Sequence, residues 1–271
     1  MSLVPKRYEL PVLSVHYFTG AMSSMRMNSN GSAWPRWGSW YFTSAAVIVG
    51  LIGVVVLFVL WARLSWRQKV LLACALTFGV LLLSSDLQRL AMSSYTSHML
   101  EHLLVIFLIA PLVAGAVSIP FRRSIATIGF LAFTVLIPLY HLTPLGSWVM
   151  GQSGGHFVEL ASFLVVGVWF WTPVYGVRRV MGDTQRLTYT VLALPVIATT
   201  GLVLWSSTSA SLSDTGMRMA MVTIGDIHSG GSVMMVWGTL LMTAHVAGIA
   251  AHSALRARTA REPVGLRYTI R

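Results

Sequence analysis

The sequence predicts an all-α, polytopic membrane protein, a bundle of seven transmembrane helices. Only 10% of its 271 residues are charged, 55% are hydrophobic, and the mean hydropathy is +0.72. A soluble domain of this length carries about a quarter charged residues, so lipid must solvate most of this surface. Long uncharged stretches recur along the chain and can cross a hydrocarbon core of ~30 Å as helices. A β-barrel would show short alternating strands instead, so helices are favoured.

The predicted spans fill residues 42–252, between a polar segment at residues 1–41 and a basic tail at residues 253–271. Tryptophans on both sides of the first span fit anchoring at the membrane interface. The last span is rich in glycine and alanine, which suits close helix packing. Four spans contain a proline, which predicts a kink: Pro111, Pro138, Pro173 and Pro195. The expected spans are residues 42–61, 70–86, 98–119, 125–141, 156–175, 188–206 and 228–250.

The distribution of basic residues predicts the orientation of the chain in the membrane. The net charge is +11, and most lysines and arginines lie in the loops 63–69, 120–124 and 176–187 and in the tail. Basic residues favour cytoplasmic loops, so the C-terminus is expected in the cytoplasm and the N-terminus outside. Anionic lipid head groups are then a sufficient partner for the basic tail, and no nucleic-acid partner is expected.

Histidines and carboxylates gather at the outer ends of the predicted spans. Ionisable residues at membrane depth are expensive and mark functional sites. His98 and His102 are spaced i, i+4, so their imidazoles lie on one helix face and can share one ion. The ionisable residues at this leaflet, from which a metal site could be built, include His98, His102, His156, Asp226, His228 and Glu101.

The residue types limit which metal this site can hold. Imidazole and carboxylate suit zinc or copper(II), whereas thioether sulfur selects copper(I). Met22, Met25 and Met27 in the polar segment form a run that can capture copper(I). The single cysteine, Cys74, excludes an intramolecular disulfide and a cysteine metal cluster. These residues alone do not distinguish a copper site from a zinc site.

Three other interpretations of the same residues also stay open. Histidines at the interface can simply bond to water or backbone, and Glu101 and Glu159 can be carboxylates favoured by a helix dipole. The segment His98-Met-Leu-Glu101-His102 matches H-x-x-E-H, in which two histidines bind zinc and the glutamate is the general base. Glu159 would then be the third zinc ligand. His98 and His228, on two different spans, could instead ligate a haem.

Three segments carry a further signal. They are Ser97-His-Met-Leu-Glu-His102-Leu-Leu with Ala110-Pro-Leu-Val, then His156-Phe-Val-Glu-Leu running to Gly167-Val-Trp-Phe-Trp171-Thr-Pro173, and Asp226-Ile-His-Ser-Gly-Gly231 followed by Met234. Over roughly residues 42–252 the chain resembles the multi-spanning CtaG family of cytochrome c oxidase assembly factors. The resemblance implies copper handling at the outer face of a bacterial membrane, at His98, His102 and Asp226, with His156 as a further candidate. Glu101 departs from the family pattern, which is usually neutral there.

These observations predict a multi-pass protein of the bacterial cytoplasmic membrane that binds or delivers copper during assembly of a respiratory haem–copper oxidase. The protein is not expected to be an enzyme, and its expected partners are the oxidase subunits. The competing interpretation is a non-catalytic accessory subunit that stays bound to the oxidase without touching metal. An intramembrane zinc peptidase and a haem-binding protein are the less favoured alternatives.

Overall fold

The computed structural model describes residues 61, 63–117, 123–152, 154–177, 181–208 and 223–261. All regular secondary structure in these ranges is helical, as the sequence predicts. The polar segment with its methionine run, and nearly all of the expected span at residues 42–61, lie outside the described residues.

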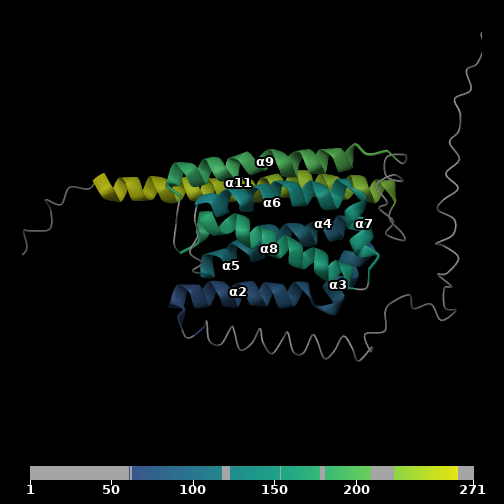
Figure 1. Cartoon of the computed structure of the whole chain (residues 1–271), viewed down its shortest axis with the longest axis horizontal. Helices are drawn as coiled ribbons and strands as arrows, with labels where there is room; N and C mark the ends of the chain where they lie inside the picture. The colour runs from purple at the N-terminus through teal and green to yellow at the C-terminus, as the bar shows by residue number, and fades with distance from the viewer. Residues whose placement is uncertain are drawn as a thin grey trace, which may run out of the picture. The chain divides into compact units, whose positions relative to one another are not determined.

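The described helices alternate in direction through one bundle (Figure 1). Four stretches are long and apolar enough to cross a membrane, namely Tyr95–Ala116, Gly155–Tyr175, Asp183–Trp205 and Ile224–Thr259. Two bent pairs, Trp66–Leu82 with Asp86–Ser93 and Ala126–Leu142 with Pro144–Met150, raise the candidate spans to six. A polytopic helical membrane protein is therefore confirmed, and the count of seven stays a prediction. The helices are α2 (Trp66–Leu82), α3 (Ser85–Ser93), α4 (Tyr95–Leu104), the π-helix η1 (Val105–Ile109), α5 (Ala110–Ala116), α6 (Arg123–Leu142), α7 (Pro144–Met150), α8 (Gly155–Tyr175), α9 (Asp183–Trp205) and α11 (Ile224–Arg261).

Two of the expected spans end in a sharp bend. The chain leaves α2 at Leu82 and turns by 62° into α3, so Asp86 lies in the first turn of α3 and not at the end of a span. Ser84, at the N-cap of α3, has an extended backbone, which serine favours at this position. After α6 the chain turns by 76° into α7, where the Thr143 hydroxyl caps the helix by accepting from the Leu145 amide.

Aromatic side chains of α6 and α8 pack against each other in the core. Phe133 stacks on Phe170 with ring centroids 4.1 Å apart, and Trp171 packs edge-on against Phe170. Aliphatic side chains such as Leu131 and Leu192 are exposed on the outward faces of α6 and α9. Exposed apolar surface of this kind fits contact with lipid.

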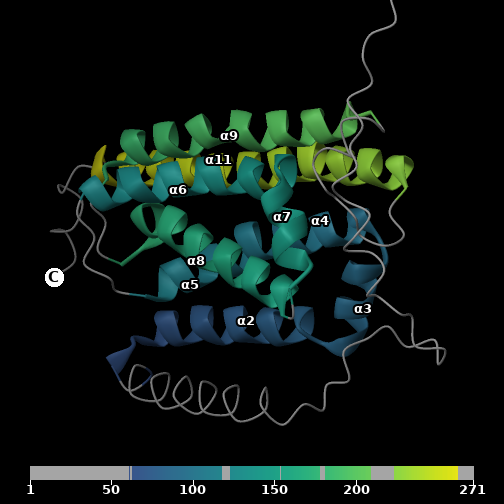
Figure 2. The ribbon, with the colours of Figure 1, turned by 45° about the vertical axis from the view of Figure 1, so that its right-hand side comes forward.

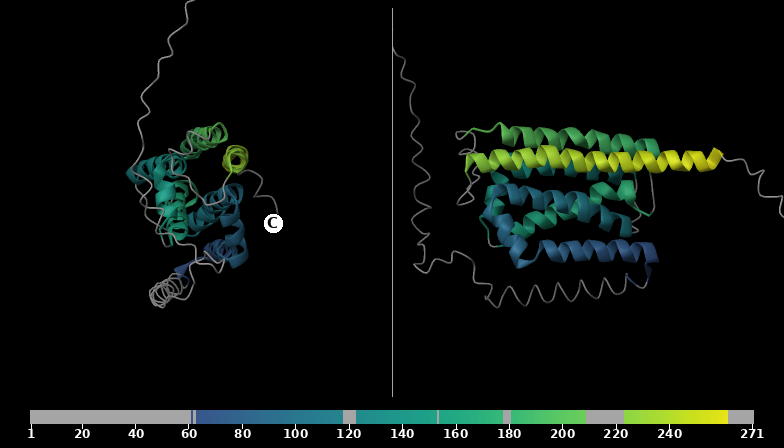
Figure 3. Two further views of the ribbon diagram at one scale, coloured as in Figure 1. Left: turned by 90° about the vertical axis from the view of Figure 1, so that its right-hand side faces the viewer. Right: turned by 180° about the vertical axis from the view of Figure 1, so that it is seen from behind.

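α9 and α11 lie side by side along most of their length (Figures 1 and 3). A Cβ on Gly231 would lie 2.6 Å from the backbone nitrogen of Trp205, and a Cβ on Gly201 would lie 2.6 Å from the backbone nitrogen of Met235. The two backbones can approach this closely because neither glycine has a side chain. The close packing predicted for the last span is therefore confirmed at Gly231. At Gly248 a Cβ would meet no described atom within 4 Å.

A π-helix interrupts the long helix between α4 and α5. Pro111 has no N–H and cannot donate to the carbonyl of Phe107. The helix widens at this point, and the Ala110 N–H bonds to the Val105 carbonyl five residues earlier. The kink expected at Pro111 thus takes the form of a π-bulge, a feature that is frequent at functional sites.

Two side chains from neighbouring helices bond to carbonyls of the π-helix. Trp171 Nε1 donates to the Ile106 carbonyl at 2.7 Å. His245 Nε2 lies 3.0 Å from the Phe107 carbonyl, while His245 Nδ1 lies 2.7 Å from the Tyr175 hydroxyl. Because a buried carbonyl without a partner costs about 1–3 kcal/mol, these bonds stabilise the position of the α4 segment against α8 and α11.

Candidate metal site between α4 and α8

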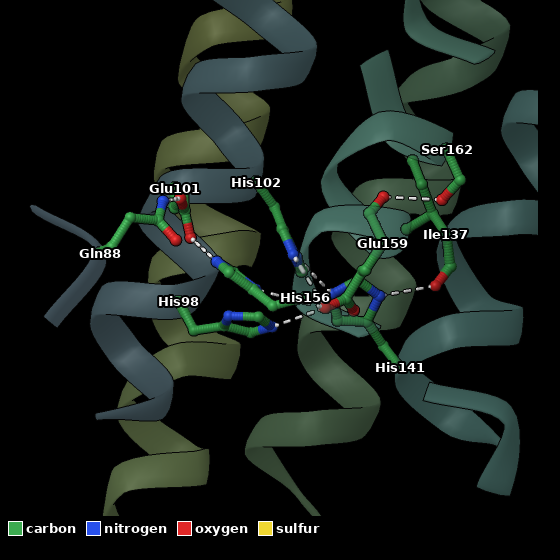
Figure 4. Close-up of polar contacts among 9 residues, drawn as sticks. All are labelled: Gln88, His98, Glu101, His102, Ile137, His141, His156, Glu159 and Ser162. Atoms are coloured by element: carbon green, nitrogen blue, oxygen red, sulfur yellow. Dashed lines mark hydrogen bonds and ion pairs between the residues drawn. The ribbon is translucent and has the colours of Figure 1, made fainter. Parts of the chain in front are cut away.

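Polar side chains from four helices converge in the bundle (Figure 4). They lie at the end where α3 and α7 are found (Figures 1 and 2). The histidines and glutamates of α4 and α6, and Glu159 of α8, are at most 3% exposed. The converging residues are Gln88 of α3, His98, Glu101 and His102 of α4, His141 of α6, and His156 and Glu159 of α8.

The carboxylate of Glu159 lies at the centre of this cluster. Its Oε2 is 3.3 Å from His98 Nε2, 3.7 Å from His102 Nε2 and 3.9 Å from His156 Nδ1. His98 and His102 share one face of α4, as their spacing predicts, and their ring centroids are 4.2 Å apart. One carboxylate oxygen is thus shared by three imidazoles from two helices.

Glu101 supplies a second buried carboxylate on the other side of His156. Its Oε1 accepts a hydrogen bond of 2.5 Å from Gln88 Nε2, which ties α3 to α4. Its Oε2 lies 3.1 Å from His156 Nε2. The imidazole of His156 therefore lies between two carboxylates, with one ring nitrogen toward Glu101 and the other toward Glu159 (Figure 4).

His141 approaches the cluster from α6 through His102. Its Nε2 lies 3.2 Å from His102 Nδ1, and its Nδ1 lies 2.7 Å from the Ile137 carbonyl of its own helix. The His102 and His141 rings are perpendicular, and Phe163 packs against both. These contacts fix the ring of His102 with its Nε2 toward Glu159.

Asp226 of α11 positions the start of α4. Its carboxylate accepts hydrogen bonds from the Tyr95 amide at 2.6 Å and from the Thr96 amide at 3.2 Å. The Thr96 hydroxyl adds a third bond at 2.8 Å. The first N–H groups of a helix lack partners within the helix, and a carboxylate there is favoured by the helix dipole. Asp226 therefore holds the helix that carries His98 and His102.

A tight turn places His156 at the start of α8. Gly154 has a φ of 78°, in the left-handed region that glycine adopts without strain. At Gly155 a Cβ would overlap the carbonyl oxygen of Val149 at the end of α7. The two glycines let α8 begin directly against α7, so His156 and Glu159 enter the bundle in its first turns.

The cluster presents buried ligand atoms that have no hydrogen-bond partner. Buried polar atoms are normally bonded, because an unpaired one costs about 1–3 kcal/mol. The ligand atoms of His98, His156 and Glu159 all lie within 4.8 Å of one another, a spacing that a single metal ion can bridge. Among the described residues, the unbonded atoms include His98 Nδ1, His102 Nε2, both ring nitrogens of His156, Glu101 Oε2 and Glu159 Oε2.

The donor atoms match a divalent cation. Three imidazoles and a carboxylate are ligands that zinc and copper(II) accept, whereas copper(I) prefers sulfur. Burying Glu101 and Glu159 together is costly unless positive charge compensates them. A divalent ion bound here would carry enough charge to neutralise both carboxylates.

Four of the predicted ligands lie together in the cluster, and the other two make hydrogen bonds outside it. His98, His102, His156 and Glu101 belong to the cluster. The carboxylate of Asp226 bonds to the start of α4, as described above. His228, two residues further along α11, has its Nε2 2.8 Å from the Ser207 carbonyl.

Glu159 and His141 are the residues that sequence reasoning placed least well. The sequence offers Glu159 as the third ligand of a zinc peptidase or as a carboxylate favoured by a helix dipole, although its i, i+3 spacing from His156 puts both on one face of α8. His141 closes a predicted span at the same end as the other histidines, yet nothing in the sequence pairs it with His102. Gln88 gives no signal, because a single glutamine carries no metal-ligand pattern.

Comparison with known proteins identifies the family. Neither a curated protein nor a solved structure matches the chain significantly. A family model described as cytochrome c oxidase caa3 assembly factor matches residues 52–255. The match includes every helix that contributes to the cluster and most of the chain. The protein therefore belongs to the CtaG family of cytochrome c oxidase caa3 assembly factors.

Proposed function

We propose that this protein binds a copper ion in the cluster around Glu159 and delivers it to a haem–copper oxidase during assembly. The observation that carries the proposal is the group of buried, unbonded ligand atoms on His98, His102, His156 and Glu159. Membership of an oxidase assembly family supports copper as the cargo. The protein would act as a carrier and not as an enzyme.

The donor set favours the divalent form of the ion. Copper(II) binds nitrogen and oxygen ligands more tightly than the other first-row divalent metals, including zinc. The methionine run that could capture copper(I) lies outside the described residues, so its part in copper capture stays a prediction. Zinc is the natural competitor in a binding experiment.

We further propose that the cluster faces the outside of a bacterial cytoplasmic membrane, in a bundle of seven spans. α2 begins and α11 ends at the end of the bundle opposite α3 and α7 (Figures 1 and 2). Arg67 and Lys69 lie at the start of α2, and Arg256 and Arg258 lie near the end of α11. Basic residues favour the cytoplasmic side, where anionic lipids attract them. The cluster at the other end would then face outward.

The test combines metal content with oxidase assembly in cells. Cells would carry the wild type, His98→Ala/His102→Ala or the control His228→Ala as their only copy, and the copper content of the purified oxidase would be measured. We expect the double variant to insert in the membrane and yield copper-deficient oxidase, whereas His228→Ala supports full loading. A fully loaded oxidase from the double variant would refute copper delivery.

The accessory-subunit interpretation predicts a different pattern in the same cells. A permanent subunit would co-purify with the oxidase in fixed ratio and would tolerate replacement of every histidine in the cluster. A bulky residue at Gly248, where a Cβ would meet no described atom within 4 Å, would then impair the complex without changing its copper content.

A further inference from the structure

His141 is buried in α6 and its hydrogen bonds determine which of its ring nitrogens carries a proton. Its Nδ1 lies 2.7 Å from the Ile137 carbonyl. A carbonyl oxygen can only accept, so Nδ1 must be the protonated nitrogen. In the neutral imidazole the other nitrogen, Nε2, is then an acceptor.

The tautomer of His141 determines the tautomer of His102. His141 Nε2 lies 3.2 Å from His102 Nδ1. Because Nε2 of His141 has a lone pair, Nδ1 of His102 must donate the proton of this bond. The neutral His102 then has no proton on Nε2. Its Nε2 lone pair points toward Glu159 Oε2, 3.7 Å away, and forms no hydrogen bond.

Two electron-rich atoms facing each other in a buried site repel unless a cation lies near both. His102 Nε2 and Glu159 Oε2 form such a pair, and a metal ion coordinated by both removes the repulsion. The packing of Phe163 against the rings of His102 and His141 opposes rotation of either ring to another arrangement. The hydrogen bonds that link the Ile137 carbonyl, His141 and His102 therefore fix the direction of the Nε2 lone pair of His102.

We propose that His141 is a positioning residue that fixes the tautomer of His102, so that His102 presents an unprotonated Nε2 to the metal ion. The inference rests on the proposed metal binding and adds a residue outside the ligand set. The partner of a metal-bound histidine typically contributes about 10–100-fold to metal affinity. Loss of His141 is expected to reduce affinity by that factor while the binding stoichiometry stays unchanged.

Two substitutions separate the tautomer effect from loss of packing. His141→Gln keeps an oxygen that can accept the His102 Nδ1 proton, whereas His141→Leu fills similar space without any acceptor. The first measurement is the ¹⁵N spectrum of the metal-free, histidine-labelled protein in lipid, with the His102 signals assigned from a His102→Gln variant. The second is the affinity for copper(II) and zinc in detergent, measured by competition with a chromophoric chelator.

We expect His102 to be protonated on Nδ1 in the wild type and in His141→Gln, and to lose this preference in His141→Leu. Copper(II) and zinc should bind His141→Leu about 10–100-fold more weakly than the wild type, and His141→Gln should recover most of that loss. A wild-type His102 protonated on Nε2, or a doubly protonated His141, would overturn the inference. Equal affinities of wild type and His141→Leu would also overturn it.

The two measurements also distinguish this inference from the proposed function. A wild type that binds neither metal refutes the proposed function, while the spectrum of the metal-free protein still tests the tautomer of His102. A wild type that binds copper with unchanged affinity in His141→Leu refutes only the role of His141. If His141→Leu does not fold, the wild-type spectrum and the His141→Gln affinity decide the outcome.

Discussion

Replacing Glu159 with glutamine removes one negative charge from the centre of the metal site and preserves the size of the side chain. Glu159 Oε2 lies 3.3 Å from His98 Nε2, 3.7 Å from His102 Nε2 and 3.9 Å from His156 Nδ1. An ion bound by these imidazoles is therefore next to this oxygen. At an effective dielectric constant of about 20, opposite unit charges about 4 Å apart attract by about 4 kcal/mol, and the second charge of a divalent ion doubles this attraction. Because about 1.4 kcal/mol corresponds to a tenfold change, Glu159→Gln should weaken copper(II) binding by at least about 10³-fold.

The assay is a competition titration of the detergent-purified protein with a chromophoric copper chelator. Asp86→Asn is a matched control, because Asp86 is an exposed carboxylate on α3 that pairs with Arg89. Its affinity for copper should equal that of the wild type. Glu101→Gln should show an intermediate loss of about 10–100-fold, because Glu101 Oε2 contacts His156 Nε2 from the side away from Glu159. Wild-type affinity in Glu159→Gln would refute the placement of the ion beside this carboxylate.

Three further substitutions test side chains around the site. Asp226→Ala removes the acceptor for the first N–H groups of α4, so thermal unfolding should reveal a loss of about 0.5–2 kcal/mol with copper stoichiometry unchanged. His228→Gln alters the contact with the Ser207 carbonyl, and the chelator titration should give wild-type affinity. His245→Phe deprives the Phe107 carbonyl of its side-chain partner, and chemical denaturation should show a cost of about 1–3 kcal/mol. Loss of copper binding in Asp226→Ala or His228→Gln would contradict the roles assigned to these residues. Wild-type stability of His245→Phe would contradict the role of His245.

Much of the site could be predicted because its ligands lie at regular positions on recognisable helices. Hydropathy locates the span that begins near His98, and the i, i+4 spacing places His98 and His102 on one face. The same reasoning brings His156 to the same end of the bundle. These inferences need only helix period and topology, which the sequence carries locally.

The sequence alone does not determine which group on a neighbouring helix each polar side chain contacts. The resemblance to the CtaG family implies Asp226 as a ligand, but a carboxylate at a membrane interface can cap a neighbouring helix equally well. Its bonds to the Tyr95 and Thr96 amides depend on how α11 packs against α4. Glu159 becomes the shared carboxylate for the same reason, since only the packing of α8 on α4 brings it between the imidazoles.

The bend at Pro111 shows a similar division between local and tertiary information. Proline predicts that the helix must deviate, because its missing N–H is a local property. The form of the deviation, a π-helix whose carbonyls bond to Trp171 and His245, depends on helices far along the chain. The break after α2 has a local signal in Ser84 and Ser85, which favour the N-terminus of a new helix.

The most direct test of the metal site is pulsed electron paramagnetic resonance of copper(II) bound to the detergent-purified protein, which counts coordinated imidazoles. The account predicts one copper per chain with three imidazoles, from His98, His102 and His156, and a spectrum that loses one imidazole in His98→Ala. The His228→Ala spectrum should match that of the wild type. Bound copper without imidazole coupling, or an imidazole count unchanged in His98→Ala, would place the metal elsewhere and contradict the account.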